Sequence, residues 1–169
     1  MLMTGCGFTP LHGTHFKSEA QKKQSIAIQE ELAQVWIGAI PNREGQFLRN
    51  ALIDRFYQKS YPTNAHYRLS ISPISTRTVS LGVTKDDDTT RGQMILSTKI
   101  TLHSPLQPDS LLTRDLKSIT SYNKLGSEFG TIVSEDNARE NGLNEIADQI
   151  ERELSLYFSR LNTDLMQTR

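Results

Sequence analysis

Cysteine is nearly absent from this 169-residue sequence, since Cys6 is the only one and no internal disulfide can form. Net charge is absent too: basic and acidic residues number 19 each, which argues against a dedicated nucleic-acid-binding protein. No apolar run reaches the roughly 18 residues that a transmembrane helix needs. The length predicts one domain with a hydrophobic core of its own.

Motifs for catalysis and metal binding are also missing. The sequence has no GxSxG, HExxH, GxGxxG or GxxxxGK[ST] pattern. His12 and His15 supply two ligands, fewer than a closed zinc site needs. In a strand or turn the consecutive Asp86, Asp87 and Asp88 would point in different directions, so we interpret them as a solvated turn rather than a calcium site. We therefore expect no enzyme activity, no metal and no cofactor.

Two segments have the spacing of amphipathic helices. In residues 43–59 apolar side chains recur three and four positions apart, and Asn42 is the expected N-cap. Residues 135–163 repeat that spacing, with Ser134 as the expected N-cap. Residues 124–133 are expected to form the loop before this last helix.

Strand-like segments lie between these helices. Residues 66–74, 78–84 and 91–104 alternate apolar and polar side chains, and 111–123 does so less clearly. An earlier strand is expected over 34–40, after a short strand-like piece at 25–28. Because strands and helices do not alternate along the chain, a doubly wound parallel sheet is disfavoured. The order predicts an α+β fold, a two-layer sandwich with two helices on one face of a four-stranded, mostly antiparallel sheet.

Side-chain environments follow from this sandwich. Trp36 and Phe47 are expected in the core. Polar side chains are expected on the sheet face turned away from the helices, namely Ser70, Ser72, Thr78, Ser80 and Thr84. That face is either simply hydrated or laid against a partner.

The N-terminus has features of a bacterial lipoprotein. Thr4-Gly5-Cys6 supplies small residues and a thiol that a diacylglycerol group would alkylate, although five residues are too few for a whole signal peptide. We expect residues 1–5 to be a signal-peptide remnant, 6–24 to be the lipidated Cys6 with a flexible tether, and 25–169 to be a single domain. An unmodified cysteine is the alternative.

Several stretches resemble the LptE family of outer-membrane lipoproteins, in its alphaproteobacterial form. CGFTPLHG at residues 6–13 is similar to the family start CGF-x-PLYG, with His12 in place of the usual tyrosine. The similarity continues through residues 90–102, the SYN at 121–123, and 136–150 in the predicted last helix.

This resemblance implies a function at the outer membrane. The family is a plug and assembly partner of the LptD β-barrel, binds lipopolysaccharide and helps insert it into the outer leaflet. Cys6 would carry the lipid anchor, and the domain would face the periplasm and the barrel lumen. Basic side chains would pair with lipid A phosphates. The candidates are Arg77, Lys85 and Arg91, with Arg68 and Lys99 as second choices, and each also fits a solvated surface charge.

Two other functions remain open. A periplasmic-facing lipoprotein that binds a small ligand or another envelope protein would need an apolar pocket between sheet and helices. A hydrolase would need a histidine beside a serine or carboxylate in a cleft, for which His66 and His103 are the candidates.

Overall fold

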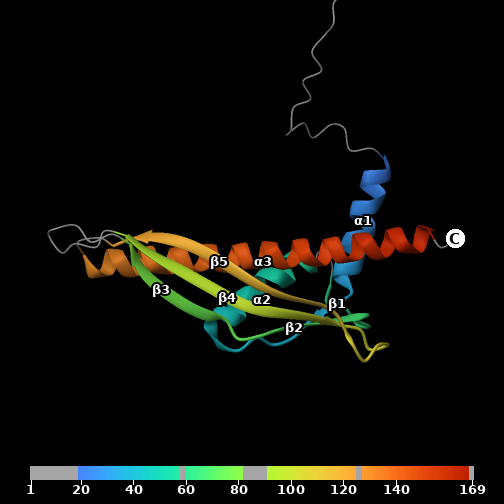
Figure 1. Cartoon of the computed structure of the whole chain (residues 1–169), viewed down its shortest axis with the longest axis horizontal. Helices are drawn as coiled ribbons and strands as arrows, with labels where there is room; N and C mark the ends of the chain where they lie inside the picture. The colour runs from blue at the N-terminus through green and yellow to red at the C-terminus, as the bar shows by residue number, and fades with distance from the viewer. Residues whose placement is uncertain (1–18, 58–59, 82–90, 125–126, 168–169) are drawn as a thin grey trace, which may run out of the picture.

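The computed structural model describes residues 19–57, 60–81, 91–124 and 127–167, which form three helices and a five-stranded sheet (Figure 1). The central strand is β4 (Arg91–His103). It pairs antiparallel with β2 (Tyr67–Ile71) and β3 (Ser75–Leu81) along one edge and with β5 (Ser110–Asn123) along the other. The short β1 (Val35–Ile37) pairs with β2 in parallel.

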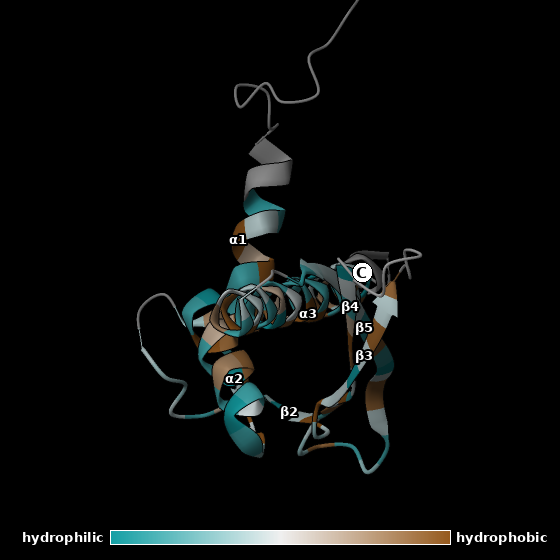
Figure 2. Cartoon of the chain, turned by 90° about the vertical axis from the view of Figure 1, so that its left-hand side faces the viewer, coloured by the Kyte–Doolittle hydropathy of each residue, from teal (hydrophilic) through white to brown (hydrophobic). Residues whose placement is uncertain are grey.

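The helices lie on one side of this sheet. The long α3 (Glu128–Gln167) packs along β5 and β4, and α2 (Asn42–Phe56) lies beside it. Figure 2 shows the sheet curving around these two helices. α1 (Glu19–Ala33) projects steeply from the C-terminal part of α3 (Figure 1).

The predicted α+β class and the mostly antiparallel sheet are confirmed, but the element count is wrong. The sheet has five strands rather than four, and α1 is a third helix. Residues 25–28, expected to be strand-like, lie inside α1 because the Ala, Gln, Glu and Leu residues around them favour a helix. α1 also begins at Glu19, within the segment expected to be a tether.

A parallel unit is present after all. β1, α2 and β2 form a strand–helix–strand unit whose two strands pair in parallel, from Val35 opposite Tyr67 to Ile37 opposite Leu69. β1 has three residues, so it adds an edge to an antiparallel sheet without creating a doubly wound fold.

Both predicted helix caps are wrong. α3 begins at Glu128, inside the expected loop, and the Oγ of Ser127 accepts a hydrogen bond from the N–H of Gly130, as an N-cap does. Ser134 lies within α3, and its Oγ accepts from the N–H of Asn123. Asn42 belongs to α2 itself and takes a φ of 70°, a left-handed conformation that asparagine tolerates.

The core lies between the sheet and α2 and α3. The predicted inward face of β4 is confirmed, since Met94, Leu96, Ile100 and Leu102 are fully buried. The predicted apolar stripe of α3 is buried as well, at Ala138, Leu143, Ile146, Ala147, Ile150, Leu154 and Phe158. Burying each large apolar side chain contributes about 1.5–3 kcal/mol, so this interface is the main source of stability.

Charged contacts join α2 to α3 at the rim of the core. The guanidinium of Arg55 donates two hydrogen bonds to the carboxylate of Asp148, at 3.1 and 2.8 Å. About three turns nearer the start of α2, Glu44 makes a second contact with α3, because its carboxylate lies 3.8 Å from Arg139. Arg139 also pairs with Asp136. Both contacts are partly exposed, so they position the helices more than they stabilise the fold.

Gly45 marks the closest approach in this layer. A Cβ added there would lie 2.9 Å from the backbone carbonyl carbon of Ile40, which cannot move as freely as a side chain. Gly142 has a related role, because a Cβ would lie 2.8 Å from Cδ1 of Leu96 and hold α3 away from the sheet. These contacts explain why two helices tolerate a residue with low helix propensity.

We predict that Gly45→Ala lowers the free energy of unfolding. Overpacking costs about 1–3 kcal/mol, while the gain in helix propensity returns at most about 1 kcal/mol. Denaturant unfolding measures the change, with Asn50→Ala, an exposed position on the same helix, as the control for propensity alone. A Gly45→Ala protein at least as stable as the Asn50→Ala control would contradict the close contact.

Candidate interaction surface

One face of the sheet is left uncovered by the described helices. On β4 it consists of the odd-numbered positions, and the strand registers place their neighbours on β2, β3 and β5 on the same face. We call this surface the open face. Its side chains are Trp36, Arg68, Ser70, Ser75, Arg77, Val79, Leu81, Arg91, Gln93, Ile95, Ser97, Lys99, Thr101, His103, Thr113, Asp115, Lys117, Ile119, Ser121 and Asn123.

A shift in register between β2 and β3 decides what β3 contributes. Ile71 lies opposite Ile100, whereas Ser75 lies opposite Ser97. From Ile71 to Ser75 the chain therefore advances by four residues, while the paired positions on β4 advance by only three. The extra residue, near Pro73, reverses which side chains point toward the helices.

Arg77, Val79 and Leu81 therefore lie on the open face. Thr78 and Ser80 lie opposite Met94 and Gly92, on the helix side, so the prediction that they face away from the helices is wrong. For Ser70 that prediction is confirmed, and Thr84 lies outside the described residues.

The open face is strongly basic. It carries five exposed basic side chains, Arg68, Arg77, Arg91, Lys99 and Lys117, and one acidic side chain, Asp115. These basic residues lie at or opposite positions 91 to 103 of β4, a track of about 40 Å at the rise of an extended strand. Asp115 lies 3.5 Å from Lys99, and both side chains are more than half exposed, so the pair is weak.

The opposite charge is concentrated on α3. Residues 128–167 contain nine acidic and three basic side chains, although the whole chain has no net charge. Several of these acids face the fold: Glu153 accepts from Arg114 at 3.1 Å, and Glu145 accepts from the hydroxyl of Ser118. The protein is therefore polarised, with a basic sheet layer and an acidic helix.

The structure brings together most of the predicted basic candidates. Arg77 lies opposite Ile95, four residues along β4 from Arg91, which places the two arginines about 13 Å apart along neighbouring strands. Arg68 and Lys99 lie on the same face. Lys85 and Cys6 lie outside the described residues.

Lys117 was missed by sequence reasoning. It lies on β5 opposite Ser97, exposed on the open face. The alternation of residues 111–123 is irregular, so the sequence gives no clear indication of which β5 side chains share a face with Arg77. The pairing of β5 with β4 shows that Lys117 and Arg77 share a face.

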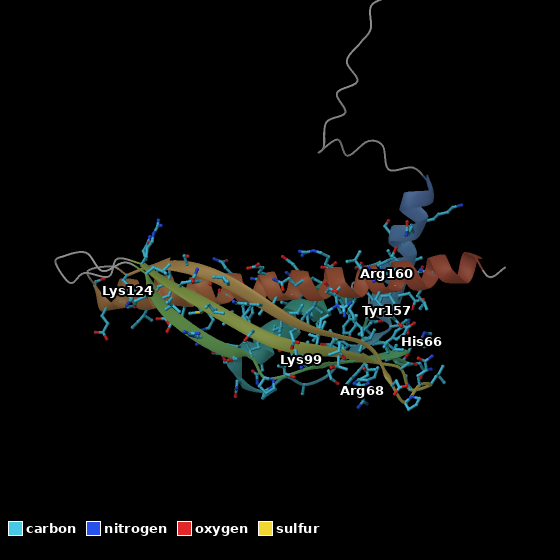
Figure 3. The ribbon with its side chains drawn as sticks, in the orientation of Figure 1. His66, Arg68, Lys99, Lys124, Tyr157 and Arg160 are labelled. Atoms are coloured by element: carbon cyan, nitrogen blue, oxygen red, sulfur yellow. The ribbon has the colours of Figure 1, made fainter. Side chains whose placement is uncertain are left out.

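Trp36 is on the open face and not in the core, contrary to prediction. Its side chain is 40% exposed, and the guanidinium carbon of Arg68 lies 4.6 Å from the ring centroid. In Figure 3 Arg68 lies on the side of the sheet away from α3, which carries Tyr157 and Arg160. Phe47, also predicted to lie in the core, is half-buried at its edge and packs against it.

Apolar side chains lie among these charges. Ile119 and Leu81 are exposed large hydrophobic residues, and Ile95 and Val79 are half-buried beside them. Arg77, Ile95 and Ile119 form one row across three strands. A surface that alternates guanidinium and alkyl groups suits an amphiphilic partner with anionic groups.

A second feature is a cleft between α1 and described residues that follow α2, namely Tyr57 and residues 60–66. Its volume is about 630 Å³, and its lining includes Ile26, Gln29, Tyr57, Tyr61 and His66. The Tyr57 hydroxyl donates to the backbone oxygen of Val35 at 2.6 Å, and burial raises the pKa of Tyr57. The cleft is not located between the sheet and α2 and α3, where the small-ligand alternative predicted a pocket.

Within the described ranges, no group of three or more His, Cys, Asp or Glu residues has the arrangement of a metal site. No described helix combines the length and hydropathy needed to cross a membrane.

The Arg68–Trp36 contact leads to a prediction. Arg68→Ala removes a stacking interaction worth about 0.5–1 kcal/mol at an exposed site and uncovers one face of the ring. Trp36 is the only tryptophan, so its fluorescence quenching by acrylamide measures the change. We expect acrylamide to quench Trp36 more strongly in Arg68→Ala than in wild type, and as strongly in Arg77→Ala as in wild type. Equal quenching in both variants would show that Arg68 does not cover the ring.

Comparison with solved structures supports the fold. A proposed lipoprotein from Caulobacter crescentus CB15 is 18% identical with a TM-score of 0.61, covering 78% of this chain and 96% of that one. Rare lipoprotein B from Shewanella oneidensis is 10% identical with a TM-score of 0.60, over 76% and 98%. A minor lipoprotein from Acinetobacter baumannii is 19% identical with a TM-score of 0.55, over 73% and 92%. At these identities the similarity shows the fold.

The family is shown by sequence. No curated protein matches the chain significantly. The profile of the LptE family, described as lipopolysaccharide-assembly, matches residues 32–154, a range that contains α2, all five strands and most of α3. The resemblance inferred from the sequence is thus confirmed, and the chain belongs to the LptE family of lipopolysaccharide-assembly proteins.

Proposed function

We propose that this protein is an outer-membrane lipoprotein that acts as the plug and assembly partner of the LptD β-barrel and helps insert lipopolysaccharide into the outer leaflet. The observation that carries the proposal is the basic open face on a chain of the LptE family. The role is binding and assembly, without a catalytic step.

Lipopolysaccharide binding is assigned to the open face. Arg77 and Arg91 are exposed and present guanidinium groups that match phosphate oxygens in bidentate geometry. Lys117 adds a third cation on the neighbouring strand, and Ile95 and Ile119 offer apolar contacts for acyl chains. Lys85, between β3 and β4 in the sequence, stays a predicted contributor.

The plug role fits the shape and polarity of the domain. The sheet and α3 extend side by side along one axis (Figure 1). Their outward surfaces are largely polar, as the lumen of an outer-membrane barrel is. The basic open face and the acidic α3 would fix one orientation in a lumen of complementary charge, because electrostatic complementarity selects register more than it raises affinity.

The membrane anchor is assigned to Cys6. Several acyl chains on one residue hold a protein far more firmly than a single chain, since each buried CH₂ adds about 0.8 kcal/mol. The residues between Cys6 and α1 would connect the anchor to the domain.

A second candidate function rests on the cleft beside α1. Its volume of about 630 Å³ falls within the usual range for small-molecule sites, and its lining mixes tyrosine rings with amide and hydroxyl groups. Under this alternative the protein is a periplasmic-facing lipoprotein that binds a small ligand. Substituting Tyr61 with alanine would then abolish ligand binding, whereas substitutions on the open face would not.

We predict that the double variant Arg77→Glu/Arg91→Glu binds purified lipopolysaccharide at least about tenfold more weakly, because two charge-assisted contacts become repulsive. Displacement of a fluorescent lipopolysaccharide measures the affinity. The control is Arg152→Glu/Arg160→Glu, an equal charge change at two exposed positions on α3. If both variants lose affinity equally, net charge and not the open face determines binding.

We predict that Cys6→Ser, expressed behind a complete lipoprotein signal peptide, loses the acyl mass and leaves the outer-membrane fraction in cells without the barrel partner. Mass spectrometry and membrane fractionation give the two readouts. His12→Ala, nearby in the sequence, is the control that keeps the thiol. A Cys6→Ser protein that remains fully in the outer membrane without the barrel contradicts anchoring through this residue.

A further inference from the structure

β3 is an edge strand that is open on both faces. Among the described strands it pairs with β4 alone. Six of its seven side chains are exposed, and Val79 is half-buried. An extended edge of this kind is a template for pairing with another strand.

The register shows which backbone groups of β3 form no bond to β4. Backbone groups along a strand point alternately to its two edges. The N–H of Ser72 donates to the oxygen of Lys99, so the odd-numbered positions of β4 direct their groups toward β2 and β3. The β3 residues opposite them bond to β4. The backbone groups of Thr76, Thr78 and Ser80 therefore point to the open edge.

This edge lacks the usual protection against strand pairing. Its sequence STRTVSL contains no proline, lysine or glycine, and its residues favour extended structure. Arg77 is its one charged side chain, and it lies on the open face rather than across the edge. The other long edge of the sheet is β5, which carries three charged residues within four positions, Arg114, Asp115 and Lys117. α3 also packs against β5, so this edge is better protected.

We propose that an extended segment of the barrel partner pairs with β3 and adds a sixth strand to the sheet. This inference rests on the proposed function and deepens it. Main-chain hydrogen bonds through Thr76, Thr78 and Ser80 supply affinity, as in other cases of strand addition. Arg77 selects a partner residue with a carboxylate at the facing cross-strand position.

Charge argues against a second copy of this chain as the occupant. Pairing two β3 edges would join two open faces into one surface, and each face carries five basic side chains and one acidic one. Like charges brought together on one sheet are destabilising. A barrel segment with acidic side chains meets the same edge with complementary charge.

A proline substitution tests the pairing directly. Thr78→Pro removes an N–H that points to the open edge and leaves the bonds to β4 intact. Thr78→Val is the matched control, because it keeps the N–H and the β-branched shape. We expect tagged full-length wild type and Thr78→Val to capture the barrel from solubilised outer membrane, and Thr78→Pro to capture about fivefold less, since one net hydrogen bond is typically worth about that factor. Equal capture by a folded Thr78→Pro overturns the proposal.

Amide hydrogen exchange provides a second readout that needs no substitution. In the barrel complex, exchange should slow about tenfold or more at Thr76, Thr78 and Ser80 relative to the free protein. The corresponding outward amides of β5, at Lys117 and Ile119, control for general shielding by the lumen. Unchanged exchange on β3, or equal slowing on β3 and β5, contradicts strand addition.

The failure of this proposal is distinguishable from failure of the proposed function. If wild type captures no barrel, the proposed function is wrong. If wild type and Thr78→Pro capture it equally and the β3 amides exchange as before, the barrel role stands and strand addition is wrong. Protection of the β3 amides in a dimer of the 19.1 kDa chain without the barrel assigns the edge to a second copy and also overturns the proposal.

Discussion

β4 is hydrogen-bonded along both edges, but the described helices cover only one of its faces, and the rest of the structure depends on this asymmetry. Its even-numbered side chains form the floor of the core under α3, where Met94, Leu96 and Ile100 are fully buried. A slip of one residue would move all of them into water, so the register is strongly fixed. The same register fixes where Arg77 and Lys117 lie on the other face. Packing on one side thus determines the arrangement of charge on the other.

The separation of acidic residues on α3 from basic residues on the open face also follows from the covering of the sheet on one side. Carboxylates of α3 are partly used within the fold, where Asp148 holds Arg55 of α2 and Glu153 holds Arg114 of β5. On the open face, within the described residues, Lys99 alone has an acidic partner. The basic side chains there add little to stability and are available to an anionic partner. A chain without net charge therefore presents a basic surface because its acids are placed in the helix layer.

The sequence predicted the elements whose periodicity is long and regular. The buried face of β4, the apolar stripe of α3 and the amphipathic α2 all follow from spacing alone. What it did not predict depends on contacts distant in the chain. The three-residue β1 exists because β2 offers it a parallel edge, and Trp36 lies on the open face because the register places it opposite Arg68. The start of α3 at Glu128 depends on Ser127 rather than on the propensities of the residues that follow.

The candidate site was predicted only in part, because the arrangement of its residues also depends on contacts between distant parts of the chain. Arg77 and Arg91 were identified as candidates for pairing with phosphates, but their shared face follows from the extra residue between Ile71 and Ser75. The most direct test is covalent footprinting of arginine and lysine side chains, with and without lipopolysaccharide, read by mass spectrometry. The account predicts protection at Arg77, Arg91 and Lys117 and unchanged labelling at Arg152 and Arg160 on α3. Protection on α3, or none on the open face, would contradict it.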